Sequence, residues 1–332
     1  MRLSFGLLAF VLAIAMAIGE AVFAEEAAPP TLAELEKAVE EGHVESMFLL
    51  GARYADGNAV EQDWAKAKEL FEQAIEKGHA EAMFRLGDMY RSIPGVEQDW
   101  KLDWKKAKEL YEQAIEAGHA EAMFCLGNMY SGGIVDDDDV VIIEQDWEKT
   151  RELYEKAAIN GSTAAAFEIG ALYMLGIGVD ENPKKAIEYL GKAAEKDHLT
   201  AMYLLGVTYT YDHVDKDLRK MQEWWEKASD KGYGDATFHI ALMYANGIDE
   251  YVEKDIQKAI DYYEKAAGQK HSGAMFYLAQ AHTKGDILEK NLKKAREWYT
   301  NIIDNNDFFI DEAKEALKAL EREEVRVEED IF

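Results

Sequence analysis

Residues 80–90 read AEAMFRLGDMY, and residues 120–130 read AEAMFCLGNMY. Related segments follow at 199–209, LTAMYLLGVTY, and at 272–282, SGAMFYLAQAH. Blocks of about 40 residues built around this segment recur seven times between Val44 and Asp307. A unit of that length cannot bury its own apolar face, so the period predicts a stack of units that contact mainly their neighbours.

Two columns of the repeat predict close packing between helices. One column holds small residues, namely Ser46, Ala82, Ala122, Ala165, Ala201, Ala236 and Ala274. The other holds Gly51, Gly87, Gly127, Gly170, Gly206, Ala241 and Ala279. Glycine inside a helix costs about 1 kcal/mol relative to alanine. Its retention in five of seven copies therefore indicates a close approach of a neighbouring helix.

A second helix is expected in each repeat, because a good helix N-cap residue recurs after the first helix. These residues are Asp63, Asp103, Asp146, Asn182, Asp217, Asp255 and Asn291. Their side-chain oxygens accept hydrogen bonds from the free N–H groups of the first helical turn. Alanines seven residues apart, such as Ala67 and Ala74, then form a one-sided apolar stripe. We expect an all-α chain without strands.

The repeat resembles the Sel-1-like repeat, a member of the tetratricopeptide-like superfamily. The fourth copy is most similar, with Gly170, Tyr173, Gly176, Gly178, Val179, Asn182, Lys185, Ala186, Tyr189, Ala193 and Ala194. The fifth copy departs most, since Tyr211, Asp212 and His213 replace its Gly-x-Gly turn. The resemblance implies a right-handed α-solenoid of stacked antiparallel helix pairs, and a role as an adaptor that assembles protein complexes.

Four segments are predicted along the chain. Residues 1–24 resemble a secretory signal peptide, with Arg2, an apolar run and a small-residue cleavage site ending at Ala24. Residues 25–43 are an N-terminal capping helix with Thr31 and Glu34 as a capping box. Residues 44–307 hold the seven repeats, and residues 308–332 hold a C-terminal capping helix and an acidic tail.

The N-terminal segment predicts export to the periplasm or to the exterior. A retained membrane anchor is the alternative, but the apolar run is short for a membrane span. We therefore expect no stable membrane insertion after signal cleavage. The single cysteine, Cys125, rules out an intramolecular disulfide bond.

The formal net charge of −28 argues against a nucleic-acid partner, because phosphate binding depends on clustered Lys and Arg. Anionic lipid surfaces are disfavoured for the same reason. The acidic residues either solvate the helix surfaces and keep the chain in solution, or select a basic partner.

No pattern typical of a catalytic, cofactor or metal site is present in the sequence, and we expect no enzyme activity, cofactor or metal. Asp136 to Asp139 lack the spacing of a calcium loop. His43, His79, His119, His198 and His271 share one repeat position. Their spacing is the repeat length, which favours a structural role as donors near a helix C-terminus over metal binding.

The first helix of each repeat has three positions, at i, i+4 and i+7, that vary while the packing columns agree. They share one side of the helix, which we call the A-helix face. Our candidates for partner binding on this face are Glu81, Arg85, Asp88, Glu121, Cys125, Asn128, Glu168, Leu204, Val207, His239 and Tyr277. The alternatives are tolerated surface variation and, for Cys125, a place in the core.

The prediction is a non-catalytic interaction scaffold of the secretory or periplasmic compartment. It would bind a protein or peptide, with a basic partner as one option, in a concave groove lined by the first helices. The alternative is a protein that binds or hydrolyses cell-wall fragments with carboxylates such as Glu121 and Glu168.

Overall fold

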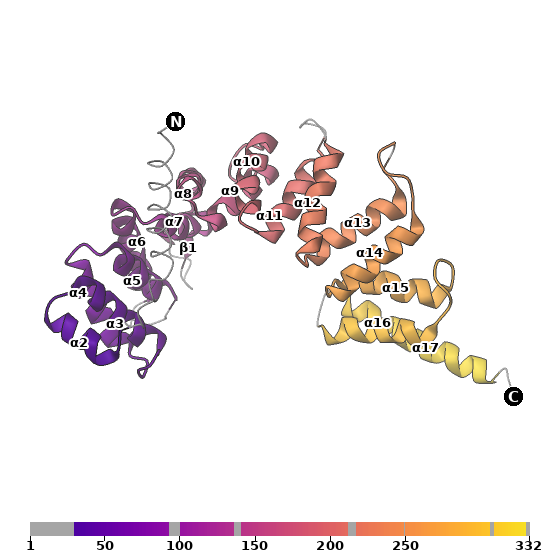
Figure 1. Ribbon diagram of the computed structural model, residues 1–332, viewed down its shortest axis with the longest axis horizontal. Helices are drawn as coiled ribbons and strands as arrows, with labels where there is room; N and C mark the ends of the chain where they lie inside the picture. Colours follow the sequence, from indigo (N-terminus) through magenta and orange to yellow (C-terminus); the bar gives the residue numbers. More distant parts are fainter. Residues whose placement is uncertain are drawn as a thin grey trace, which may run out of the picture. The chain divides into compact units, whose positions relative to one another are not determined.

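Sixteen helices and one short hairpin make up the part of the chain that the computed structural model describes (Figure 1). This part covers residues 30–92, 100–135, 141–211, 217–248, 250–305 and 309–329. The signal peptide predicted at 1–24, the run from Asp136 to Asp139 and the turn at Asp212 and His213 lie outside it.

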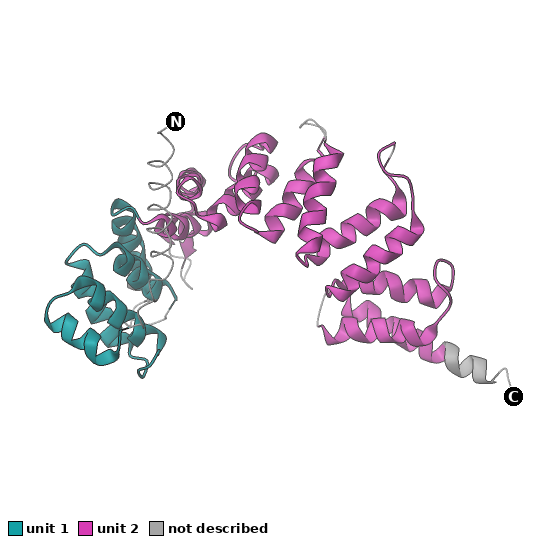
Figure 2. Cartoon of the chain, viewed as in Figure 1, with its two compact units in different colours: residues 1–118 teal, residues 119–332 magenta. Residues whose placement is uncertain are grey.

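The chain divides into two compact units, residues 1–118 and 119–332 (Figure 2). The first contains α2 (Leu32–Glu40), α3 (Val44–Asp56), α4 (Trp64–Ile75), α5 (Ala80–Ser92) and α6 (Trp100–Glu116). The second contains α7 (Ala120–Gly132), α8 (Trp147–Ile159), α9 (Thr163–Leu175), α10 (Pro183–Ala194), α11 (Leu199–Thr208), α12 (Leu218–Asp230), α13 (Gly234–Asn246), α14 (Ile256–Gly268), α15 (Ser272–Lys284), α16 (Leu292–Asp304) and α17 (Ile310–Glu329).

Consecutive helices pack in pairs, and each pair packs on the next within its unit. The first helices of the pairs, the odd-numbered α3 to α15, are called A helices here. The second helices, the even-numbered α4 to α16, are called B helices. This arrangement confirms the α-solenoid of stacked helix pairs that the repeat period predicts.

The two packing columns lie where the helices approach most closely. Ala82, Ala122 and Ala165 are completely buried. A Cβ atom added to Gly127 would lie 2.6 Å from the ring of Tyr154, and one added to Gly206 would lie 2.4 Å from Trp225 Nε1. Glycine therefore leaves room for a large side chain of the B helix in the same repeat, which is aromatic in four of the five copies and is Leu190 opposite Gly170.

Six of the seven predicted caps are confirmed. In each, the side-chain oxygen accepts from the backbone N–H three residues on, for the residues Asp63, Asp146, Asn182, Asp217, Asp255 and Asn291. The prediction for Asp103 is wrong, because α6 begins at Trp100 and Asp103 is buried inside its first turn. The sequence Glu-Gln-Asp-Trp, which occurs at residues 61–64, 97–100 and 144–147, marks this start, since α4, α6 and α8 each begin at its Trp.

The expectation of a chain without strands is wrong for the insertion in the third repeat. Strand β1 (Ile134–Val135) pairs with β2 (Val141–Ile143) in an antiparallel hairpin. β-Branched residues favour the extended backbone, and Ile143 of β2 is buried. The Ile and Val residues of the two strands therefore account for the hairpin.

Both ends of the helix array bury apolar side chains. The capping box of Thr31 and Glu34 is present at the start of α2, whose Leu35 is buried with Leu50 and Leu70. At the far end, α17 buries Ala313 and Leu320. This helix continues to Glu329, into the segment predicted to be an acidic tail. Among the described residues, no helix combines the length and the apolar character needed to cross a membrane.

Candidate functional site

The A-helix face presents side chains that are partly accessible to solvent. Ten of the eleven candidate residues are half-buried, and only Asn128 is fully exposed. Glu81, Arg85 and Asp88 lie on α5 in the first unit, and the other eight lie on α7, α9, α11, α13 and α15 in the second. In the second unit the face therefore extends over five A helices.

The first position of the face is coupled to the start of the following repeat. The Nε2 atom of His79 lies 3.1 Å from a carboxylate oxygen of Glu45, and that of His271 lies 3.2 Å from Asp235. In these two repeats the first position therefore contacts a histidine at the start of the next A helix. This pairing was not predicted from the sequence.

Four of the five histidines of this column cap A helices, whereas His43 forms no side-chain cap hydrogen bond. The Nδ1 atoms of His79, His119, His198 and His271 accept hydrogen bonds at 3.1 to 3.2 Å from the third backbone N–H of the next helix. In the fourth repeat, the hydroxyl of Ser162 accepts the same hydrogen bond. The predicted role as donors at a helix C-terminus is therefore wrong, because these side chains are acceptors at a helix N-terminus.

The middle position of the face contacts neighbouring helices. Arg85 donates to Asp56 of the preceding A helix at 3.0 Å. The hydroxyl of Tyr203 lies 3.3 Å from His239 Nε2, while His239 Nδ1 lies 2.9 Å from the carbonyl oxygen of Asp235. These contacts fix the orientation of the His239 ring between α11 and α13. Tyr277 stacks on Tyr263 of α14, in the preceding repeat, at 3.9 Å between ring centroids.

The third position holds the aromatic side chain of the B helix in the second and third repeats. Asp88 accepts a hydrogen bond from the Tyr111 hydroxyl at 2.9 Å and forms an ion pair with Arg91 at 2.7 Å. Asn128 accepts a hydrogen bond from the Tyr154 hydroxyl. Asp88 and Asn128 therefore support their own repeat, and a substitution at Asp88 would disturb packing as well as any partner contact.

Glu168 differs from these residues. It lies half-buried on α9, and burial raises the pKa of its carboxyl group. Among the residues that the structure describes, none forms a hydrogen bond or an ion pair with it. Glu168 is therefore a partly desolvated carboxylate on the A-helix face without a cation.

A column of Lys and Tyr pairs was not predicted. The lysine three residues after the N-cap lies over a tyrosine ring of the preceding A helix. The distance from Nζ to the ring centroid is 4.0 to 5.0 Å for Lys66 with Tyr54, Lys149 with Tyr130 and Lys258 with Tyr244. Such cation–π contacts contribute about 0.5–1 kcal/mol each at exposed sites. The recurrence of Lys and Tyr at these two positions of the repeat could have predicted the pairs.

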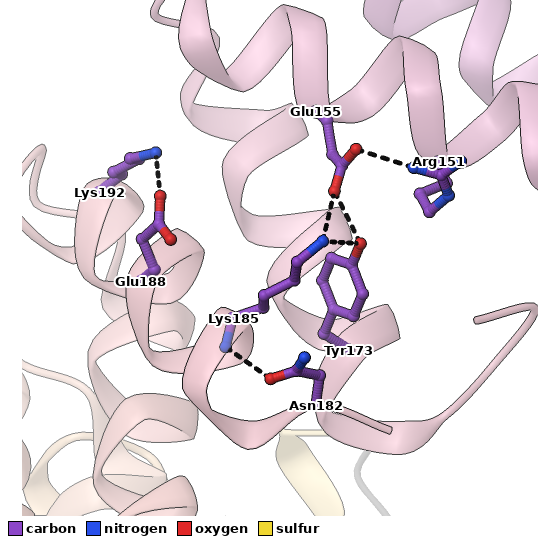
Figure 3. Close-up of polar contacts among 7 residues, drawn as sticks. All are labelled: Arg151, Glu155, Tyr173, Asn182, Lys185, Glu188 and Lys192. Atoms are coloured by element: carbon purple, nitrogen blue, oxygen red, sulfur yellow. Dashed lines mark hydrogen bonds and ion pairs between the residues drawn. The ribbon is translucent and has the colours of Figure 1, made fainter. Parts of the chain in front are cut away.

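In the fourth repeat this pair belongs to a larger polar cluster (Figure 3). Glu155 of α8 accepts hydrogen bonds from the Tyr173 hydroxyl at 2.7 Å and from Lys185 Nζ at 3.2 Å. Its other oxygen accepts from Arg151 at 3.0 Å. Burial acts to raise the pKa of Glu155, but the hydrogen bonds from Tyr173 and Lys185 outweigh it and hold that pKa below its ordinary value. The cluster joins α8, α9 and α10.

An open cavity of about 760 Å³ lies beside this cluster, lined by Arg151, Lys185 and the turn from Gly176 to Asn182. Arg151 and Lys185 are already paired with Glu155. The acidic residues Glu148 and Asp180 also line the cavity. The cavity therefore offers no unpaired positive charge to an anionic ligand. Among the described residues, no group of three His, Cys, Asp or Glu side chains is arranged to hold a metal ion.

A comparison with protein families matches the Sel1 repeat to seven segments of the chain. The segments are residues 44–79, 80–119, 120–162, 163–198, 199–233, 234–271 and 272–307. Each contains one A helix and the B helix that follows it. No curated protein matches the sequence.

Solved structures with the same architecture include two bacterial proteins. A protective antigen of uropathogenic Escherichia coli strains, which displays an SLR fold, is 25% identical with a TM-score of 0.59. That match covers 81% of this chain and 62% of the antigen, so the chain spans less than two thirds of the antigen's length. A Sel1 repeat protein from Oxalobacter formigenes is 24% identical with a TM-score of 0.65, over 86% of this chain and 78% of that protein.

Proposed function

We infer that this chain, which belongs to the Sel1 repeat family, is a non-catalytic scaffold that binds a protein or peptide along the A-helix face of its second unit. Sel1 repeat proteins generally act as scaffolds for protein interactions. In stacked helical hairpins the A helices usually line the concave surface, where an extended peptide or a partner helix fits.

The link between Tyr203 and His239 carries this proposal. It joins side chains of two consecutive A helices into one half-buried surface. Leu204 and Val207 lie on the same helix as Tyr203 and are also half-buried. Half-buried aromatic and aliphatic side chains on a regular scaffold are the kind of surface that supplies the centre of a protein interface.

The proposal includes export, with signal cleavage after Ala24 and a mature protein in the periplasm or outside the cell. Sequencing the N-terminus of the protein recovered from its host tests this part directly. A mature N-terminus at Glu25 supports it. A protein that keeps its first residues and stays in the cytosol contradicts it.

Partner binding is tested by substitutions on the face. Leu204→Gln and His239→Ala should each weaken the binding of a captured partner about tenfold or more, which corresponds to about 1.4 kcal/mol. Glu188→Gln on the opposite helix of the fourth repeat is the matched control. Circular dichroism confirms that each variant is folded. Unchanged affinity in both face variants would contradict the proposal.

A further inference from the structure

We infer that the occupant of this face is a basic peptide segment, and that Glu168 pairs with a lysine or arginine side chain of that segment. This inference rests on the proposed function, because it assumes that a peptide lies along the A helices of the second unit. It adds the chemistry of the partner and the residue that recognises it.

The first observation is the separation of charge between the two kinds of helix. The five A helices of the second unit contain a single Lys or Arg residue, Lys284 in the last turn of α15. The five B helices contain two or three each. The acidic side chains of these A helices are Glu121, Glu168 and Asp235, of which Asp235 lies 3.2 Å from His271. A face with carboxylates and almost no cations attracts positive charge.

The second observation is the state of Glu168. Its neighbours on the face are uncharged, because Ala164 and Ala171 lie one turn away on the same side of α9. The carboxylate is half-buried and has no cation among the described residues. Partial burial without a partner disfavours its charged form. A partner's ammonium or guanidinium group would restore the missing interaction, and at a partly desolvated site such a pair is stronger than on an open surface.

The third observation is an aromatic surface formed by side chains of α11, α12 and α13. The rings of Tyr203, Trp225 and His239 lie within 6.3 Å of one another, centroid to centroid. Tyr203 and His239 are half-buried and reach solvent. Aromatic faces of this kind attract cations, and also bind the aliphatic stems of Lys and Arg.

The geometry sets an approximate spacing in the peptide. Neighbouring packed helices lie about 8–10 Å apart, and an extended chain advances about 3.3 Å per residue. One A helix therefore corresponds to roughly three peptide residues. A basic residue opposite Glu168 would be followed, about three residues later, by an apolar residue opposite Leu204. About three residues after that, a residue would contact Tyr203 and His239.

The experiment is a selection of binders from a random ten-residue peptide library on the immobilised protein, followed by fluorescence anisotropy with the selected peptides. We expect enrichment of Lys or Arg, with an apolar residue about three positions away. The affinity should fall as salt is added, because the pair is electrostatic. Selected sequences without basic residues would overturn the inference.

The pair itself is tested by a double-mutant cycle. Glu168→Gln should weaken the selected peptide about tenfold, and replacing the basic residue of the peptide by Gln should weaken it equally. The combined change should cost no more than either alone. Glu188→Gln, an equal change of charge at a carboxylate that pairs with Lys192 on α10, should have no effect. Restored binding of a Glu-containing peptide to Glu168→Lys would confirm the contact.

The outcomes separate this inference from the proposed function. If the peptides bind Glu168→Gln as tightly as the wild type but lose affinity for Leu204→Gln, the basic contact is wrong and the A-helix face remains the binding surface. If neither variant changes the affinity, or if the library yields no binder, both the inference and the proposed face are wrong.

Discussion

The imidazole ring of His198 stacks on the ring of Phe167, with 4.4 Å between their centroids. The same ring caps α11, since its Nδ1 atom accepts a hydrogen bond from the backbone N–H of Ala201 at 3.1 Å. Burial lowers the pKa of His198, so the folded protein favours the neutral ring. Protonation would place a hydrogen on Nδ1 and remove the cap.

We therefore expect His198 to make the stability of the protein depend on pH. The unfolded chain protonates this side chain near pH 6.5, whereas the folded protein resists protonation. The unfolded state binds more protons below that pH, so the contribution of His198 is complete above pH 6.5 and is lost as the pH falls. Urea denaturation at pH 8 and pH 5 measures the effect.

Two variants serve as controls for His198. His198→Ser keeps an acceptor, as Ser162 does in the fourth repeat, and should reduce the loss of stability between pH 8 and pH 5. His198→Ala removes the cap at every pH and should cost about 1 kcal/mol at pH 8. Equal pH dependence in the wild type and both variants would show that His198 does not titrate with folding.

Gly206 and Gly191 should respond in opposite ways to alanine. A Cβ atom at Gly206 would lie 2.4 Å from Trp225 Nε1 and 3.2 Å from the carbonyl oxygen of Met221, so Gly206→Ala should destabilise the fold by about 1–3 kcal/mol. A Cβ atom at Gly191 on α10 meets no atom within 4 Å. Gly191→Ala should therefore stabilise the fold by about 0.5–1 kcal/mol.

Urea denaturation compares the two glycine variants directly. The same substitution is made in two helices, so intrinsic helix propensity contributes equally to both. A Gly206→Ala variant as stable as Gly191→Ala would mean that α11 does not approach Trp225 closely.

The sequence predicts the helix pairs because their causes are local and repeated. Alanine and glycine columns, apolar stripes and N-cap residues each recur at the repeat length, and the structure places them at helix contacts and helix starts. Asp103 shows the limit of this reasoning. Its place in the N-cap column did not show that α6 begins before Asp103. The Trp of the Glu-Gln-Asp-Trp motif marks that start.

The candidate site was less predictable, because its contacts join side chains of different helices. Glu45 of α3 meets His79 at the start of α5, and Asp235 of α13 meets His271 at the start of α15, only after the A helices stack. The positions that vary among the copies are therefore of two kinds. Some, such as Asp88, form contacts within the fold, and others, such as Glu168, have no hydrogen-bond partner among the described residues. Exposure and hydrogen bonds, which a sequence does not give, separate the two groups.

Glu155 should stabilise the junction of the third and fourth repeats. Removing its charge weakens hydrogen bonds from Tyr173, Lys185 and Arg151. Hydrogen bonds to charged groups contribute about 1.5–3 kcal/mol, so Glu155→Gln should lower the free energy of unfolding by about 1–3 kcal/mol at pH 7. Thermal and urea denaturation measure the loss.

The low pKa of Glu155 gives this prediction a pH dependence. The folded protein holds the carboxylate charged at a pH where the unfolded chain has begun to protonate it, near 4.5. The stabilisation is therefore complete above that pH and is lost as the pH falls below it. Glu188→Gln is the control, because Glu188 forms an exposed ion pair with Lys192 and its loss should change stability by less than about 0.5 kcal/mol. Similar losses in both variants would contradict a special role for Glu155.

Cys125 tests the accessibility of the A-helix face in the native protein. Its thiol is half-buried on α7, so iodoacetamide should modify the folded protein more slowly than the protein unfolded in urea, but to completion. A bound peptide that covers this part of the face should slow the reaction further. Mass spectrometry over time measures both rates, and Cys125→Ala reports any background modification, since Cys125 is the only cysteine of the chain.

The absence of reaction in the native state would place the thiol in the core and remove Cys125 from the binding face. A native rate equal to the unfolded rate would mean that the packing around α7 is looser than the structure shows.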